Sequence, residues 1–163
     1  MKKTWQEKMK DKKNFPKILK LEKGFPCYNA LHKMGVEEGE DVVLANPSEI
    51  IEIMKNVPEK KLITLTEICK TLAEKHRVKG CCSLTTGIFI MTIANAVEEM
   101  KNEGKIIDVP YWRTIKADGT LNEKYPGGAS AQKSMLEKEG FTVMQKGKKY
   151  IVNKYHQHLM NQV

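Results

Sequence analysis

The sequence predicts a mainly α-helical protein with a small amount of β-structure, and three observations lead to this prediction. Thr64 and Glu67 form a capping box ahead of apolar residues at helical spacing. Gly80 interrupts the chain, and a long apolar helix follows over about 84–103. A strand is predicted over 106–115. A helix, a loop, a second helix and a strand, in this order, are typical of a winged helix-turn-helix.

The segment before this core, residues 1–46, predicts little regular structure. Residues 1–30 are rich in lysine and contain two Phe-Pro pairs, so we expect an extended arm with at most a short helix over 4–12. Residues 31–46 are acidic, and we expect them to be irregular.

The ordered domain is expected to begin at Asn46-Pro47-Ser48, where Ser48 can cap a helix. Apolar residues then recur at helical spacing until Val57-Pro58 ends the helix. A short extended piece over 61–64 leads into the capping box, and the next helix runs to about Lys75.

Turn residues organise the C-terminal half. Asp118-Gly119 predicts a turn, and Gly127-Gly128 leads into a helix over 129–139 that a glycine ends. Strands over 141–144 and 149–152 flank a Lys-Gly-Lys turn and predict a hairpin. The chain thus divides into an N-terminal arm with an acidic segment, a winged-helix domain, and a basic C-terminal hairpin and tail: residues 1–46, 47–141 and 142–163.

The composition, 40% hydrophobic and 29% charged over 163 residues, is typical of a soluble globular protein. No apolar run approaches the roughly 20 residues of a membrane span, and the N-terminus has no apolar export core, so we expect a cytoplasmic protein with reduced thiols and no membrane contact. The four cysteines show neither C-x-x-C spacing nor a histidine partner, so we predict no metal and no cofactor. The pair Cys81-Cys82 is interpreted as buried near a helix start, with a redox or soft-metal site as the alternative.

The net charge of +8 is unevenly distributed. Residues 1–23 hold nine lysines against three acids, and after Glu139 four lysines follow with no acid. Residues 34–54 hold six acids and no lysine or arginine. Two basic ends around a near-neutral middle indicate contact with a polyanion, most commonly nucleic acid, although a solvated lysine surface gives the same pattern.

Short motifs follow one another in order along the second half of the chain. They are Val109-Pro110-x-x-Arg113, Ala117-Asp118-Gly119, Tyr125-x-Gly127-Gly128, Gln132-Lys133, Leu136 and Glu139-Gly140. With Ile63-Thr64 at the start of a helix, their order and spacing resemble the DNA-binding domain of the alkylguanine-DNA alkyltransferases over about 47–141. The resemblance implies the winged helix-turn-helix of that domain.

The resemblance also implies that the chemistry of this family is lost. Alkyltransferases carry Pro-Cys-His-Arg, and this chain has Tyr111 in place of the cysteine and Trp112 in place of the histidine. Transfer needs a thiolate activated by a base, whereas a phenol with a pKa of about 10 accepts alkyl groups poorly and an indole nitrogen only donates. Glu139, which resembles the glutamate that orients the histidine, would accept another hydrogen bond or remain a surface charge. We therefore predict that the protein is not an enzyme.

Alkyltransferase-like proteins, a non-enzymatic branch that binds damaged DNA, also replace the cysteine but normally keep the histidine and arginine. This chain keeps only the arginine. The resemblance places the helix 84–103 in the minor groove of double-stranded DNA. The candidate DNA contacts are Thr64, Arg77, Lys79, Ser83, Thr85, Thr86 and Arg113.

Hydroxyls and free backbone amides at the start of a helix favour a phosphate, but the same residues can simply cap a helix that belongs to the core. Residues 87–97 hold no lysine or arginine. In the family, an arginine that replaces the extruded base would fall near Thr86-Gly87, and a tyrosine that helps to rotate the nucleotide would fall at Leu65. Leu65 is therefore either a wedge or a buried residue.

The resemblance also implies a pocket for a base. Its candidate residues are Tyr111, Trp112, Tyr125, Gly127, Gly128 and Glu139. Aromatic walls of this kind stack on a flat ring, at about 1–3 kcal/mol per base, and the glycines allow close approach. Alternatively, Tyr111 and Trp112 fill the vacated pocket and close it.

The leading hypothesis is a non-catalytic DNA-binding protein that recognises modified bases for other repair proteins. The alternative is a protein-interaction or regulatory module that reuses the fold, which the acidic segment 34–54 and the uncharged helix favour. An enzyme that uses Tyr111 or the Cys81-Cys82 pair is the weakest hypothesis, because no base is evident beside either.

Overall fold

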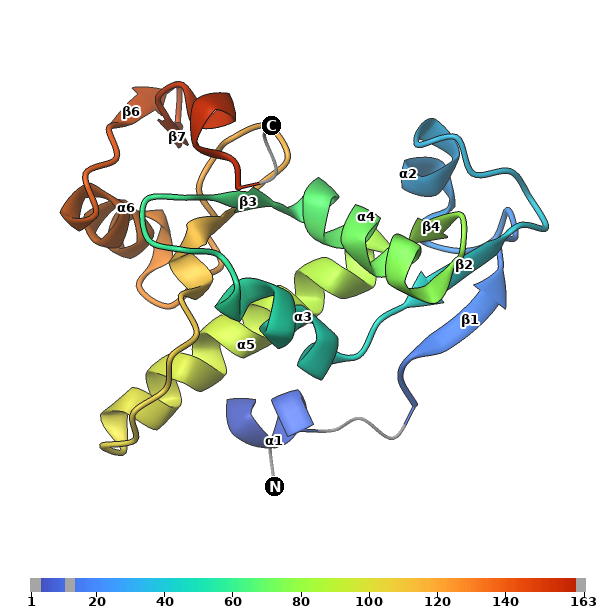
Figure 1. Ribbon diagram of the computed structural model, residues 1–163, viewed down its shortest axis with the longest axis horizontal. Helices are drawn as coiled ribbons and strands as arrows, with labels where there is room; N and C mark the ends of the chain where they lie inside the picture. Colours follow the sequence, from blue (N-terminus) through green and yellow to red (C-terminus); the bar gives the residue numbers. More distant parts are fainter. Residues whose placement is uncertain (1–3, 11–13, 161–163) are drawn as a thin grey trace.

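A computed structural model of the protein describes residues 4–10 and 14–160. The helices are α1 (Trp5–Lys10), α2 (Tyr28–Lys33), α3 (Pro47–Lys55), α4 (Leu65–His76), α5 (Ser83–Asn102) and α6 (Gly128–Lys138), with 3-10 turns η1 (Tyr111–Arg113) and η2 (Tyr155–His158). Helix α5 runs through the middle of the molecule, and α1, α3 and α4 pack against it (Figure 1).

Short strands form three small sheets. The strands are β1 (Lys17–Lys20), β2 (Asp41–Leu44), β3 (Ile63–Thr64), β4 (Gly80–Cys81), β5 (Thr114–Ile115), β6 (Val143–Lys146) and β7 (Lys149–Val152). β2 pairs antiparallel with β1 and parallel with β4, β3 pairs parallel with β5, and β6 and β7 form an antiparallel hairpin. Because β4 directly precedes α5, the first sheet fixes the position at which α5 begins.

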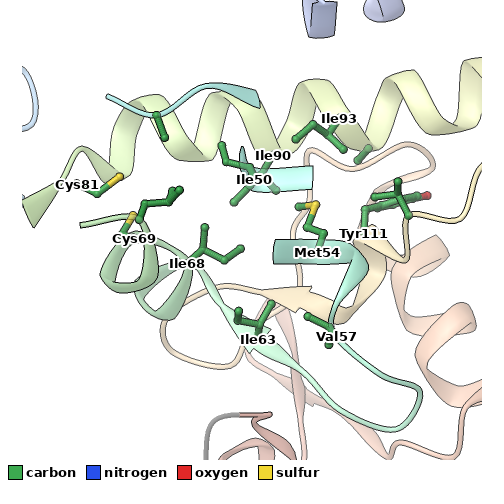
Figure 2. Packing of buried hydrophobic residues seen from close by; sticks show 14 of the residues in the cluster. Ile50, Met54, Val57, Ile63, Ile68, Cys69, Cys81, Ile90, Ile93 and Tyr111 are labelled. Carbon is green, nitrogen blue, oxygen red and sulfur yellow. The ribbon is translucent and has the colours of Figure 1, made fainter. Parts of the chain in front are cut away.

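The core lies between α3, α4 and α5. Figure 2 shows Ile50 and Met54 of α3 and Ile68 of α4 beside Ile90 and Ile93 of α5. All five side chains are buried. A helix enclosed in this way is apolar on most sides, which explains the uncharged stretch of α5.

The predicted helix starts are confirmed, with one correction. The capping box at the start of α4 is present, because the Thr64 hydroxyl accepts from the backbone N–H of Glu67 and the Glu67 carboxylate accepts from that of Thr64. The cap of α3 is Asn46 rather than Ser48: the Asn46 side-chain oxygen accepts the Ser48 N–H at 2.8 Å. Pro47 then occupies the first helical turn, where it needs no donor.

The expectation that residues 31–46 are irregular is wrong for α2 and β2. Among the described residues before them, α1 confirms the short helix expected over 4–12, and β1 is paired with β2 instead of belonging to a free arm. Leu21, Leu31 and Val36 are fully buried in a small cluster of their own, which explains why this segment folds. Helix α1 docks on α5, where Glu99 accepts hydrogen bonds from the backbone N–H groups of Trp5 and Gln6, each at 3.2 Å. The domain boundary at residue 46 remains a prediction.

The predicted strand over 106–115 is present only at its end, as β5. Pro110 has no backbone N–H to donate to a neighbouring strand, and the chain then turns through η1. Only Thr114 and Ile115 therefore pair with β3. Helix α6 confirms the predicted helix over 129–139, starting at Gly128. The hairpin is also confirmed, with its first strand two residues later than expected.

In the part of the chain that the structure describes, no helix is both long and apolar enough to cross a membrane. The same residues contain no cluster of three or more His, Cys, Asp or Glu side chains able to hold a metal ion. Each of the four cysteines is a buried free thiol. The Cys81-Cys82 pair is buried as interpreted, and the sulfur of Cys82 caps α5 by accepting the N–H of Thr85 at 3.5 Å.

Candidate functional site

A pocket of about 250 Å³ opens between the first half of α5, the start of α4 and the segment 114–125. Its lining is mostly apolar and includes two lysines: Leu65, Ser83, Leu84, Gly87, Ile88, Ile90, Met91, Thr114, Ile115, Lys116, Asn122, Lys124 and Tyr125. Of the predicted pocket and DNA-contact residues, only Tyr125 and Ser83 lie in it.

Tyr125 forms the inner wall of the pocket. Its hydroxyl donates to the carbonyl of Thr114 at 3.1 Å and contacts that of Tyr111 at 3.3 Å. Burial raises the pKa of Tyr125 above its usual value, so the phenol stays neutral. The loop that carries Tyr125 is held by Gln132, a fully buried side chain of α6 that accepts the N–H of Asn122 at 2.7 Å and donates to the carbonyl of Thr114 at 3.1 Å.

Tyr111 lies in the core beneath the pocket and does not line it. It is fully buried, and its ring packs edge-on against Tyr125 with centroids 5.2 Å apart. Its hydroxyl donates to Glu98 on α5 at 2.8 Å. Burial, and then the neighbouring carboxylate of Glu98, raises the pKa of Tyr111 above its usual value. Tyr111 is thus buried beside an open pocket that Tyr125 lines and Tyr111 does not.

Trp112, Arg113 and Glu139 form a separate cluster. Glu139 accepts the indole N–H of Trp112, and Arg113 Nε lies 3.0 Å from Glu139 Oε2. Arg113 Nη1 also donates to the carbonyl of Val57 at 2.8 Å. Arg113 and Glu139 are nearly buried, which corrects the expectations that Arg113 faces DNA and that Glu139 and Trp112 border the pocket.

The charge of Glu139 is stabilised by this cluster. Burial alone would raise the pKa of Glu139, but hydrogen bonds from the backbone N–H of Lys60 and from Trp112 and Arg113 outweigh it and hold the pKa below its usual value. Glu139 is thus paired with the indole of Trp112 and the guanidinium of Arg113.

The hydroxyl residues at the helix starts differ in exposure. Thr86 is fully buried and donates to the carbonyl of Cys82 at 2.8 Å, and Thr64 is buried in its capping box. Thr64 caps α4, and Thr86 bonds to the carbonyl four residues earlier at the start of α5, so both hydroxyls are used inside the protein, which corrects their prediction as DNA contacts. Thr85 is half-buried, and its hydroxyl accepts from the thiol of Cys82 at 3.4 Å.

Arg77 and Lys79 are exposed but lie away from the pocket. They border a separate hollow together with Lys20, Glu40 and Asp41, and the Lys79 ammonium is 3.9 Å from Glu40. The acidic residues reduce the positive charge at this place, so Arg77 and Lys79 are weaker candidates for phosphate contact than the sequence indicates.

Gly127 and Gly128 shape the loop next to the pocket without lining it. Gly127 has a left-handed backbone with φ of 78°, and an added Cβ would lie 2.7 Å from the Cβ of Ala131. This close approach explains the need for glycine at the start of α6.

Sequence reasoning missed Leu84 and Ile88, each about 51% exposed on α5 beside the pocket. Their i, i+4 spacing places them on one face of the helix, which the sequence does signal. The sequence does not show that the segment 114–125 leaves this face of α5 uncovered; only the structure does. Lys116, Lys124 and Thr114 were missed for the same reason.

The fold of this chain is similar to that of two solved structures, both of S. pombe proteins in complex with DNA. S. pombe ATL in complex with DNA matches with 17% identity and a TM-score of 0.51, over 71% of this chain and 94% of that chain. S. pombe Atl1 in complex with damaged DNA containing O6-carboxymethylguanine matches with 21% identity and a TM-score of 0.50, over the same shares. No protein-family model matches the sequence, and no curated protein matches it significantly. The resemblance drawn from the sequence is thus confirmed at the level of the fold.

Proposed function

We propose that the protein is a non-catalytic DNA-binding protein that recognises a modified base without alkyl transfer and marks it for other repair proteins. The position of Tyr125 carries this proposal. The residue that the sequence resemblance assigns to the base pocket lines a pocket at the start of α5. Its volume of about 250 Å³ lies just below the range of pockets for drug-sized ligands, about 300–1,000 Å³, and suits a single base.

The DNA-facing surface, in this proposal, is the first half of α5. α4 and α5 act as the helix-turn-helix. Leu84 and Ile88 are half exposed on this surface, and minor-groove proteins commonly insert apolar side chains between base steps. Lys116 and Lys124 line the same pocket and supply positive charge for the phosphates.

The surroundings of Tyr111 and Trp112 support binding without chemistry. Tyr111 lies outside the pocket as a neutral phenol bound to Glu98, so it cannot attack a base there. The only N–H of the Trp112 indole is used by Glu139. Neither residue offers a nucleophile or a base to a bound nucleotide.

A second candidate is a module that binds a protein partner. The exposed apolar side chains Leu84 and Ile88 favour it, because such a face on a helix also suits a partner helix or groove. Glu40 and Asp41 near Lys79 would repel phosphate and weaken a DNA footprint on that side.

Fluorescence anisotropy with labelled duplexes, with and without an alkylated guanine, tests the leading proposal across a series of salt concentrations. We expect binding at low salt that weakens as salt increases, with preference for the alkylated duplex. Absence of binding to either duplex at low salt would exclude DNA as the partner. A stoichiometric protein partner in a pull-down would then favour the second candidate. Equal binding to both duplexes would remove only base recognition.

A further inference from the structure

The side-chain amide of Asn122 differs from the other polar groups along the pocket. Asn122 is half-buried and lines the pocket beside Tyr125. The lining also holds the hydroxyl of Ser83 and the ammonium groups of Lys116 and Lys124. A hydroxyl turns to donate or to accept, and an ammonium on a flexible stem adapts to its partner. The amide of Asn122, in contrast, is fixed by the chain around it.

Hydrogen bonds at the backbone and at the side chain hold Asn122 in place. Its backbone N–H donates to the buried side chain of Gln132 at 2.7 Å, and its carbonyl accepts the N–H of Tyr125 at 3.3 Å. Its Oδ1 accepts the backbone N–H of Lys124 at 2.9 Å, which closes an Asx turn. This last bond also sets the orientation of the amide, because a backbone N–H must meet the oxygen. Nδ2 is therefore at the other end.

Of the two N–H groups on Nδ2, one is left for a ligand. Burial raises the pKa of Tyr125, and the side chain of Asn122 opposes this shift by donating toward the phenol oxygen. That contact uses one N–H at most. In the described part of the chain, the one side-chain nitrogen or oxygen that is both buried and unpaired is Oγ1 of Thr114, so Nδ2 is not sealed off from the pocket.

A donor held in one orientation discriminates between bases by the edge that they present. Guanine carries a proton on N1, so this atom is a donor. Alkylation at O6 removes the N1 proton, and N1 becomes an acceptor. A fixed N–H that faces N1 of guanine leaves two donors unpaired, which is unfavourable in a desolvated pocket, whereas the same N–H bonds to N1 of the alkylated base.

We infer that Asn122 is a specificity-determining residue, whose Nδ2 donates to N1 of an O6-alkylated guanine in the pocket. This inference rests on the proposed function, in which the ligand of the pocket is a modified base of bound DNA. The apolar side chains of α5 in the lining, Leu84, Ile88 and Met91, are left to contact the ring and its alkyl group.

The variant Asn122→Asp tests the inference. It keeps the shape of the side chain and an oxygen for the N–H of Lys124, and it replaces the donor by an acceptor. Anisotropy would measure its affinity for a duplex that contains O6-methylguanine and for the matching guanine duplex. The added negative charge weakens both complexes alike, so the ratio of the two affinities is the measure. We expect this preference to fall by about fivefold to tenfold, the effect of one lost hydrogen bond.

Asn95→Asp is the matched control. Asn95 also lies on α5, outside the lining of the pocket, and its Nδ2 donates to the carbonyl of Met91 at 2.9 Å within the helix. This variant makes the same chemical change and adds the same charge. It should leave the preference for the modified duplex unchanged.

A change in the ligand tests the same contact without a change in the protein. In O6-methyl-1-deazaguanine, a C–H group replaces N1. The wild type should bind a duplex that contains this base about fivefold to tenfold more weakly than the O6-methylguanine duplex. Asn122→Asp should no longer favour the O6-methylguanine duplex over the deaza duplex.

The outcomes separate this inference from the function on which it rests. If the wild type binds neither the modified nor the guanine duplex, the proposed function fails and the inference fails with it. If the wild type prefers the modified duplex and Asn122→Asp shows the same preference, the inference alone is overturned. Equal affinity of the wild type for the O6-methylguanine and deaza duplexes would also overturn it, because N1 would then accept no hydrogen bond.

Discussion

Tyr111 and Glu98 are joined by a hydrogen bond of 2.8 Å that the phenol donates to a carboxylate oxygen on α5. The residue that replaces the family's nucleophile in the sequence resemblance is thus tied to the central helix, beneath the pocket. Its role in the structure is to hold η1 against α5. This role can be separated from DNA binding by experiment.

Tyr111→Phe is expected to lower the free energy of unfolding by about 1 kcal/mol, because it removes this bond while keeping the buried ring. Affinity for DNA should not change, because Tyr111 does not line the pocket. Urea denaturation and anisotropy measure the two effects. A double-mutant cycle with Glu98→Ala provides the control, since Tyr111→Phe should cost much less when Glu98 is absent. A loss of DNA affinity in Tyr111→Phe would contradict the assignment.

The Arg113–Glu139 pair predicts a pH dependence of stability. The folded-state pKa of Glu139 lies below the unfolded value of about 4.3, so this pair stabilises the protein above that pH. The contribution is lost as the pH falls through the folded pKa. Glu139→Gln should therefore destabilise the protein at pH 7 by about 3 kcal/mol, because Arg113 is left nearly buried and unpaired.

Urea midpoints between pH 3 and pH 7 check this prediction. The difference between wild type and Glu139→Gln should be constant near pH 7 and should shrink below about pH 4. A difference that stays constant down to pH 3 would show that the carboxylate is not the stabilising species.

The need for glycine at position 127 can be measured against a matched glycine. Gly127 and Gly104 have nearly the same left-handed backbone, with φ of 78° and 79°, but only Gly127 has a close neighbour. Gly104→Ala should cost about 1 kcal/mol from backbone strain alone, and Gly127→Ala about 3 kcal/mol because its Cβ meets that of Ala131. Ala131→Gly should restore part of the loss in Gly127→Ala. Equal costs for the two alanine variants would exclude the steric explanation.

Much of the fold could be predicted from local patterns, because helix starts and turns depend on neighbouring residues. The capping box of Thr64 and Glu67 and the hairpin after residue 142 are examples. The N-terminal segment could not be predicted, because β1 and β2 depend on pairing with each other and with β4, far along the chain. The prediction of a strand over 106–115 was wrong for a similar reason. β3 has only two residues, so only Thr114 and Ile115 pair with it.

The candidate site was predicted less well than the fold. The family resemblance placed Tyr125 at a pocket, and Tyr125 does line one. The surroundings of the other residues depend on burial, which is set by tertiary packing. Thr86 and Arg113 have side chains typical of DNA contacts, yet Thr86 bonds to Cys82 and Arg113 to Glu139.

The two lysines that line the pocket, Lys116 and Lys124, lead to a prediction about DNA affinity. Lys116 and Lys124 line the pocket, and if they contact phosphates they act on any sequence equally. The double variant Lys116→Ala/Lys124→Ala should weaken binding to modified and unmodified duplexes alike. The slope of log affinity against log salt should become shallower by up to about 2, since each phosphate contact contributes about 0.9. The control Lys55→Ala/Lys70→Ala removes two exposed lysines that do not line the pocket and should leave the slope unchanged. If both double variants reduce the slope equally, the charge acts through the whole protein, and the pocket side is not the DNA-facing surface.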